Sequence, residues 1–282
     1  MRSPVTLLFV PGHRESMVAK AHQLPADAVV FDLEDSVPPA ERDTARALVG
    51  ETLATWPADG PARPYVRINA PADGILAADA AVVARSAEAG VLIPKVDWPA
   101  ELDQLAGYPA LLGRSLLVSI ETPRSLFRVE AFADHPLVSG LFLGSEDLTQ
   151  ALGMRRTAEG AELSWPRFLT VAAARAAGKL AYDSICPEFR DLEVLRNDAE
   201  VAAAAGFDGK FAIHPAQLPV IVAAFTPDEA EVLRAERIVN AYDAAVAAGR
   251  GAVAVDGQMV DPPVAERARA LLGRVRLVDG SR

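Results

Sequence analysis

Two carboxylates, Glu121 and Asp147, follow apolar runs of the kind that form buried strands, at residues 116–120 and 140–143. Thr122 already supplies an N-cap for the helix after the first run, so Glu121 has no evident structural role. Neighbouring strands lie about 4.8 Å apart, which allows two carboxylates at their ends to share one divalent ion. Such a pair, completed by waters and substrate oxygens, is the usual way in which proteins bind Mg²⁺. Asp147 also has a structural explanation, because an acid in the first turn of a helix complements the helix dipole.

Two basic residues end other apolar runs of the chain. Arg67 lies in the run at residues 65–69, where an unpaired guanidinium is costly, so it should face a partner anion. A metal and an arginine together suit a small 2-oxo acid, whose carboxylate Arg67 would hold. Such a site would stabilise an enolate in carbon–carbon bond chemistry. Lys95 is a second cation for an anionic substrate, or the ion-pair partner of Glu121 or Glu34.

Eight apolar runs alternate with Ala-rich amphipathic segments along the chain. The runs cover residues 7–10, 28–33, 65–69, 91–96, 116–120, 140–143, 180–184 and 211–213, and helices are expected at 14–22, 39–55, 73–89, 166–177 and 188–205. Continuous apolar runs are typical of strands buried on both faces. The pattern predicts an α/β fold, the (β/α)8 TIM barrel. A doubly wound open sheet is the competing fold, but it would show a Gly-rich phosphate loop that residues 11–14 (PGHR) do not fit.

Active sites of such barrels lie at the carboxyl ends of the strands. Nearly every predicted strand ends in a polar or charged group, and we expect these groups on one rim: His13, Arg14, Asp32, Glu34, Asp35, Arg67, Asn69, Lys95, Glu121, Ser145, Glu146, Asp147, Asp183, Ser184 and His214. Scattered surface charge would not produce this arrangement. Ser145 is also a candidate N-cap for the helix that follows the sixth strand.

The barrel is expected to cover residues 1–225, and residues 226–282 form a C-terminal helical extension. In this extension one helix is predicted at residues 227–249 and a last one at 263–273, on either side of a Gly-rich break and a short tail. Asp261 precedes two prolines in the tail and, from its surroundings alone, indicates the start of the last helix.

Composition excludes several classes of function. The chain has 282 residues and a net charge of −10, which argues against nucleic-acid binding, and it has no apolar run long enough for a bilayer. One cysteine and no signal-peptide pattern favour the cytoplasm. Four scattered histidines argue against a His-rich zinc site, so a hard cation held by carboxylates is expected.

A family resemblance rests on six motifs that recur in this order. They are residues 8–14 (LFVPGHR), 31–37 (FDLEDSV), 66–69 (VRIN), 120–123 (IETP), 144–148 (GSEDL) and 213–215 (IHP). With them the chain resembles the citrate lyase beta-chain-like group of the HpcH/HpaI aldolase superfamily, which also holds malyl-CoA and citramalyl-CoA lyases. The resemblance implies a TIM barrel, Mg²⁺ bound through Glu121 and Asp147, and Arg67 on the carboxylate of the oxo acid.

The resemblance also implies roles for further residues. Glu34 and Asp35 match positions beside the metal waters, and Asp261 matches an acid–base residue on a tail that reaches over the active site of a neighbouring subunit. A homotrimer or a multiple of it is therefore expected. The substrates implied are acyl-CoA thioesters, for whose phosphates Arg14 and Lys95 are available.

We therefore expect a Mg²⁺-dependent carbon–carbon lyase. It would cleave a thioester such as citryl-CoA or malyl-CoA into acetyl-CoA and a 2-oxo acid, oxaloacetate or glyoxylate. An acyl-CoA thioesterase and a malate-synthase-like enzyme would use the same site. A subunit that binds the oxo acid without turnover by itself is a further alternative, and partners such as an acyl carrier protein or a citrate lyase complex stay open.

Overall fold

The computed structural model describes residues 3–58, 60–157 and 159–279 and divides the chain into two compact units. The first unit, Ser3–Val222, contains the barrel, and the second begins at Ala223. The boundary falls within helix α9 (Leu218–Phe225), close to the division that the sequence predicts after residue 225.

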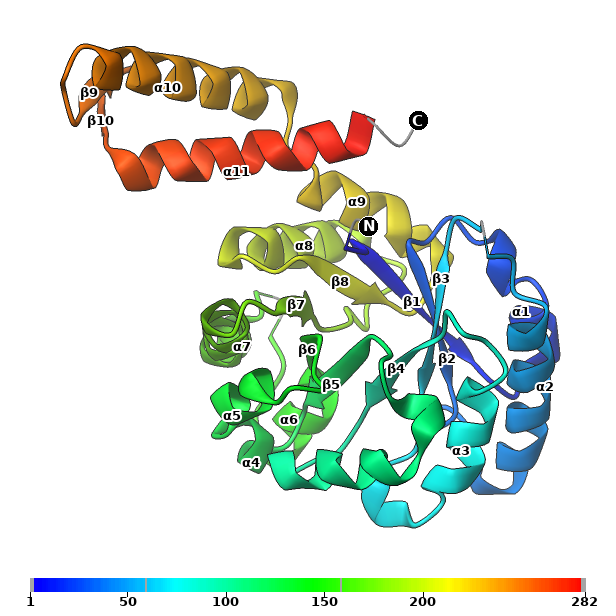
Figure 1. Cartoon of the computed structure of the whole chain (residues 1–282). Coiled ribbons are helices and arrows are strands. Elements are labelled where there is room, and N and C mark those ends of the chain that lie inside the picture. The colour runs from blue at the N-terminus through cyan, green and yellow to red at the C-terminus, as the bar shows by residue number, and fades with distance from the viewer. Residues whose placement is uncertain (1–2, 59, 158, 280–282) are drawn as a thin grey trace. The chain divides into compact units, whose positions relative to one another are not determined.

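Eight parallel strands close into a barrel in chain order, each paired with its neighbours and the last with the first (Figure 1). They are β1 (Thr6–Pro11), β2 (Ala28–Asp32), β3 (Arg63–Arg67), β4 (Gly90–Ile93), β5 (Leu116–Ile120), β6 (Gly140–Leu143), β7 (Leu180–Asp183) and β8 (Gly209–Ala212). The predicted (β/α)8 barrel is confirmed, and the open sheet is excluded. Helices cover the outer face of each strand, and packed side chains cover its inner face. Both faces are therefore buried, which explains why the runs are continuously apolar.

Helices follow the strands and surround the barrel (Figure 1). The α-helices of this unit before α9 are α1 (Glu15–Val18), α2 (Arg42–Ala54), α3 (Leu76–Val83), α4 (Pro123–Leu126), α5 (Val129–Asp134), α6 (Ser145–Ala151), α7 (Ser164–Ala176) and α8 (Leu192–Ala205). Short 3₁₀ helices are η1 (Ala21–Gln23), η2 (Pro39–Glu41), η3 (Pro71–Asp73), η4 (Pro99–Gly107), η5 (Pro109–Leu111), η6 (Ala161–Leu163) and η7 (Pro215–Gln217). Among the described helices, none combines the length and apolar character needed to traverse a bilayer.

Two strands end at least two residues earlier than predicted, for local reasons. Strand β4 stops at Ile93 because Pro94 has no N–H to donate and Lys95 adopts a left-handed φ of 51°. Strand β3 stops at Arg67, and the N–H of Asn69 donates instead to the Asp79 carboxylate at 2.7 Å. Both ends turn the chain away from the sheet at the rim.

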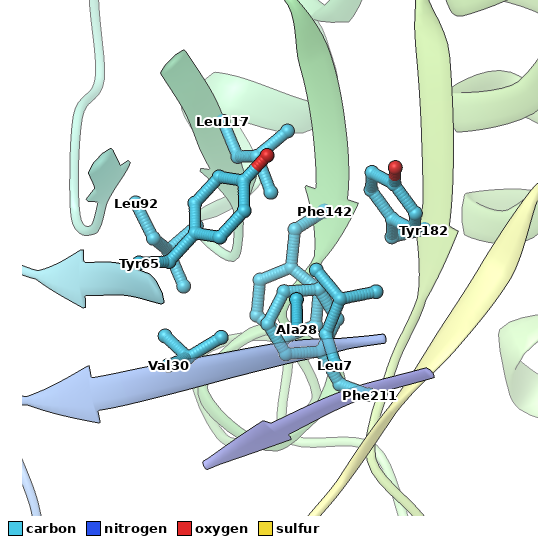
Figure 2. Packing of buried hydrophobic residues seen from close by; sticks show 9 residues of the cluster. All are labelled: Leu7, Ala28, Val30, Tyr65, Leu92, Leu117, Phe142, Tyr182 and Phe211. Atoms are coloured by element: carbon cyan, nitrogen blue, oxygen red, sulfur yellow. The ribbon is translucent and has the colours of Figure 1, made fainter. Parts of the chain in front are cut away.

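The barrel interior is filled by one or two side chains from each of the eight strands. Figure 2 shows these side chains turned toward one another: Leu7, Ala28, Val30, Tyr65, Leu92, Leu117, Phe142, Tyr182 and Phe211. The rings of Phe142 and Phe211 lie with centroids 4.0 Å apart. This packed centre leaves the rim as the place where polar groups can meet a ligand.

The second unit contains α10 (Glu229–Ala247), an antiparallel hairpin of β9 (Val253–Val255) and β10 (Gln258–Val260), and α11 (Pro262–Asp279). The helices α10 and α11 pack side by side (Figure 1). Their core includes the buried residues Tyr242, Val260 and Ala265. The tail between the predicted helices is thus a hairpin.

Candidate active site

A cavity of about 270 Å³ opens at the carboxyl ends of the barrel strands. Its charged lining comprises five carboxylates and one guanidinium, from Asp32, Asp35, Glu121, Glu146, Asp147 and Arg67. Its apolar lining includes Phe9, Phe142, Ile185 and Ile213. The barrel therefore brings the predicted metal ligands and the predicted anion-binding arginine to one cavity.

Arg67 is held in place by Asp32, its register partner on the neighbouring strand. Its Nε and Nη2 each donate to one carboxylate oxygen of Asp32 at 2.7 Å. Burial alone would raise the pKa of Asp32, but Arg67 and the N–H groups of Ser36 and Glu34 outweigh it and hold that pKa below its ordinary value. Two of the five N–H groups of Arg67 thus donate to Asp32. The two N–H groups of Nη1 and the second N–H of Nη2 can donate to other anions.

Glu34 and Asp35 share the ammonium group of Lys95. The Lys95 Nζ lies 2.5 Å from Glu34 Oε1 and 2.6 Å from Asp35 Oδ1, while Arg67 Nη1 lies 3.2 Å from Glu34 Oε2. Burial nevertheless raises the pKa of Glu34 to about 7, against the opposing effect of the two cations. Of the two pairings considered for the Lys95 side chain, the one with Glu34 is confirmed.

Glu121 is buried, with 2 % of its surface exposed, at the mouth of β5. Its Oε1 accepts the backbone N–H of Lys95 at 2.6 Å, which the left-handed conformation of Lys95 directs there, and its Oε2 accepts the hydroxyl of Ser119 at 2.6 Å. Burial and the nearby negative charge of Asp147 raise the pKa of Glu121 despite these hydrogen bonds. Thr122 caps α4, as the sequence predicts, by accepting the N–H of Ser125 at 3.0 Å.

Asp147 lies in the first turn of α6, half-buried on the cavity wall. The predicted N-cap is wrong by one residue, because Gly144 is the N-cap and Ser145 is the first residue of the helix. A glycine is required there, since a Cβ at position 144 would lie 2.5 Å from the Cβ of Glu121 and 2.7 Å from the hydroxyl of Ser119. This close approach brings the start of α6 against Glu121.

Three of the five cavity carboxylates are neutralised by cations, which pair Asp32 with Arg67, Asp35 with Lys95 and Glu146 with Arg156. Within the part of the chain that the structure describes, neither Glu121 nor Asp147 has an ion-pair partner. The described residues also contain no group of three or more His, Cys, Asp or Glu side chains that could hold a metal ion. Two adjacent carboxylates without counter-ions fit a Mg²⁺ that keeps its other positions for water and substrate. A divalent cation would also relieve their mutual repulsion.

The remaining predicted site residues lie elsewhere. Arg14 is exposed at the start of α1 and does not line the cavity. Asp261 belongs to the second unit, where its carboxylate accepts the N–H of Val264 at 3.3 Å at the start of α11. Its role as a helix start is confirmed, and its role as an acid–base residue stays a prediction.

The expectation of polar groups at nearly every strand end is wrong for β7. Asp183 is fully buried between barrel and helices, where it accepts both Nε and Nη2 of Arg167 and the ammonium of Lys210 at 2.6 to 3.0 Å. The chain beyond β7 instead lines the cavity with Ile185. His214 does not line the cavity either, and its Nδ1 accepts the N–H of Ala216 at 3.1 Å.

Sequence reasoning missed two residues that shape the site, Ser119 and Arg156, and one pairing. Asp32 was expected on the rim, but its partner was not named, although Asp32 and Arg67 end adjacent predicted strands. Ser119 lies two residues before Glu121 and so projects from the same face of β5, which is a weaker signal. Nothing in the sequence near Arg156 indicates its contact with Glu146.

The sequence model of the HpcH/HpaI aldolase/citrate lyase family matches residues 5–215 of this chain. The chain belongs to this family. Membership agrees with the resemblance stated from the six motifs, and it makes the chain a lyase-type enzyme.

Individual relatives carry two kinds of name. A citrate lyase subunit beta-like protein of Deinococcus radiodurans is 36% identical, over 95% of each chain. A (3S)-malyl-CoA thioesterase of Cereibacter sphaeroides is 35% identical, over 97% of this chain and 95% of its own. The crystal structure of CitE from Mycobacterium tuberculosis, in complex with magnesium, acetoacetate and coenzyme A, is 34% identical and superposes with a TM-score of 0.83, over 97% of this chain and 99% of its own.

Proposed function

We propose that this chain is a Mg²⁺-dependent carbon–carbon lyase that cleaves a hydroxy-acid thioester of the citryl-CoA or malyl-CoA type. The observation that carries the proposal is the pair Glu121 and Asp147, the two cavity carboxylates for which the described residues supply no counter-ion. They would hold the metal. Support comes from CitE of M. tuberculosis, a relative solved with magnesium and coenzyme A.

The bound metal would supply Lewis-acid stabilisation of negative charge on the oxygens of the hydroxy or oxo acid. Arg67 would bind the carboxylate of that acid through Nη1, which takes no part in the two bonds to Asp32 and which the substrate would share with Glu34 Oε2, 3.2 Å away. The ion pair with Asp32 orients the guanidinium before substrate arrives, so little conformational freedom is lost on binding. The apolar wall of Phe9, Phe142 and Ile213 excludes water around the reacting carbons.

In the proposed reaction the bond between the carbinol carbon and the α-carbon of the thioester breaks. The hydroxyl gives its proton to the Asp261 carboxylate and becomes the carbonyl of the 2-oxo acid, and the electron pair of the broken bond stays on the α-carbon. That carbon takes up one proton to give acetyl-CoA. We assign the return of this proton to Asp261, from the same or a neighbouring chain of a cytoplasmic homotrimer or a multiple of it.

The other predicted residues receive supporting roles. Glu34 and Asp35 would order water beside the metal, held by Lys95. The ammonium of Lys95 has a third N–H, which would be available to an anionic substrate. Arg14, exposed outside the cavity, would act on the distant phosphates of coenzyme A.

A thioesterase is the second candidate, because the relative from C. sphaeroides carries that name at 35% identity. In that reaction water adds to the thioester carbonyl, and the carbon–sulfur bond breaks instead of the carbon–carbon bond. The same metal and arginine would bind the hydroxy acid.

One assay separates the candidates. The purified chain is incubated with malyl-CoA or citryl-CoA, with and without Mg²⁺, and products are identified by mass spectrometry. A lyase yields acetyl-CoA and glyoxylate or oxaloacetate, whereas a thioesterase yields free coenzyme A and an intact hydroxy acid. Condensation of acetyl-CoA with the oxo acid tests for synthase-like activity, and binding of the oxo acid without turnover would indicate a subunit that needs partners. Unchanged Mg²⁺ affinity and turnover in Glu121→Gln or Asp147→Asn would overturn the metal assignment.

A further inference from the structure

Arg156 connects the segment between α6 and α7 to the wall of the cavity. Its Nη1 donates to the hydroxyl of Ser145 at 2.9 Å and to the carboxylate of Glu146. Its Nε lies 3.1 Å from Glu162, whose carboxylate also accepts the hydroxyl of Thr157 at 2.7 Å. One guanidinium therefore contacts the first turn of α6 and the segment that leads to α7.

The first turn of α6 presents two consecutive carboxylates to the cavity, Glu146 and Asp147. They differ in their partners among the described residues, since Glu146 is paired with Arg156 and Asp147 has no ion pair. Both line the same cavity as Glu121. Of the two acids in this turn, Arg156 therefore neutralises Glu146 and not Asp147.

We propose that Arg156 is a positioning residue that holds Glu146 away from the metal and so limits the site to two carboxylates. The inference rests on the proposed function, since it concerns the same metal site. Two carboxylates suit Mg²⁺, which keeps several waters and requires near-octahedral geometry. A third carboxylate, long and freely rotating, would favour Ca²⁺, which accepts more oxygen ligands in a flexible arrangement. Arg156 thereby keeps positions open for the substrate.

The test measures metal binding alone, by titration calorimetry of the full chain with Mg²⁺ and with Ca²⁺. Arg156→Gln releases Glu146, and we expect Ca²⁺ affinity to rise relative to Mg²⁺ affinity by about tenfold. In the double variant Arg156→Gln/Glu146→Gln the released carboxylate is gone, so the ratio should return to the wild-type value. Glu162→Gln is the matched control, because it weakens the anchoring of the same segment but leaves the pair of Arg156 and Glu146 intact. Its ratio should equal that of the wild type.

Three results would overturn the inference. In the first, Arg156→Gln weakens both metals equally and the double variant restores nothing, which is the behaviour of a merely structural residue. In the second, Glu162→Gln changes the ratio as much as Arg156→Gln does. Both leave the proposed function standing, provided that the wild-type chain binds Mg²⁺. In the third, the wild-type chain binds neither metal, and the metal site of the proposed function fails as well.

Discussion

Arg67 and Asp32, which end the adjacent strands β3 and β2, form a two-point ion pair in which both N···O distances are 2.7 Å. The pair is buried, with 13 % of the arginine side chain and 2 % of the aspartate side chain exposed. Arg67, the residue predicted to bind the substrate carboxylate, is therefore part of a fixed network. Its orientation depends on Asp32, which need not contact the substrate.

Replacing Asp32 with asparagine tests this dependence. Breaking a buried pair leaves an uncompensated charge, so Asp32→Asn should lower the free energy of unfolding by about 3 kcal/mol. The loosened guanidinium should raise KM for the thioester about tenfold, the size expected for a lost charge-assisted contact. Urea denaturation and steady-state kinetics measure the two effects. Asp43→Asn, which removes the exposed partner of Arg46, is the control and should change neither.

Relative to the wild type, Glu121→Gln should raise the free energy of unfolding in the absence of metal and lower it in the presence of Mg²⁺. Without metal, removing a buried charge that Asp147 repels should stabilise the fold by about 1 kcal/mol. The amide keeps both hydrogen bonds, because the Ser119 hydroxyl can accept as well as donate. Saturating Mg²⁺ should stabilise the wild type and leave the variant unchanged. Equal shifts of Tm by Mg²⁺ in both proteins would show that Glu121 is not a ligand.

Gly144→Ala should disrupt the metal site. The new methyl group would lie 2.6 Å from Oε2 of Glu121, so either α6 or the glutamate must move. We expect a loss of at least tenfold in Mg²⁺ affinity, together with destabilisation of about 1 to 3 kcal/mol from overpacking. Gly107→Ala is the control, because a Cβ there meets nothing within 4 Å. Retention of full Mg²⁺ affinity by Gly144→Ala would contradict the tight contact between Gly144 and Glu121.

Stability should depend on pH through Glu34. Its pKa is raised from 4.5 to about 7, so between these values the folded chain holds a proton that the unfolded chain has released. The contribution of Glu34 to stability is therefore fully present below about pH 4.5 and is lost as pH rises toward 7. Glu34→Gln should flatten the decline in unfolding free energy between pH 5 and pH 7, measured by urea denaturation at a series of pH values. A variant whose decline is as steep as that of the wild type would assign the titration to another group.

Asp261 can be tested for action between subunits by mixing two inactive variants. Oligomers assembled from Asp261→Asn and Glu121→Gln chains should recover part of the activity, because some sites would combine an intact metal pair with an intact acid from a neighbour. Co-expression with two affinity tags isolates the mixed oligomers. Inactive mixed oligomers would place Asp261 in the same chain as the metal it serves, or outside catalysis altogether. Light scattering that shows only monomer would exclude action in trans.

The sequence by itself determined the barrel and the approximate location of its site. Strands β5 and β6 have the predicted bounds, since a continuous apolar run between polar residues is a local signal. Once the strands are known to be parallel, Glu121 and Asp147 are expected at one rim, because each follows a strand at its carboxyl end. This expectation made the location of the site predictable without knowledge of any contact.

Only the tertiary structure decided which charges remain free. Arg156, which lies in another segment, neutralises Glu146. Asp183 points into a buried network with Lys210, although its position at a strand end predicts a place on the rim. Such pairings depend on the direction and reach of side chains brought together by folding, which hydrophobic periodicity does not encode. That Glu121 and Asp147 are the two cavity carboxylates left unpaired by the residues the structure describes is therefore a property of the folded charge network rather than of local sequence.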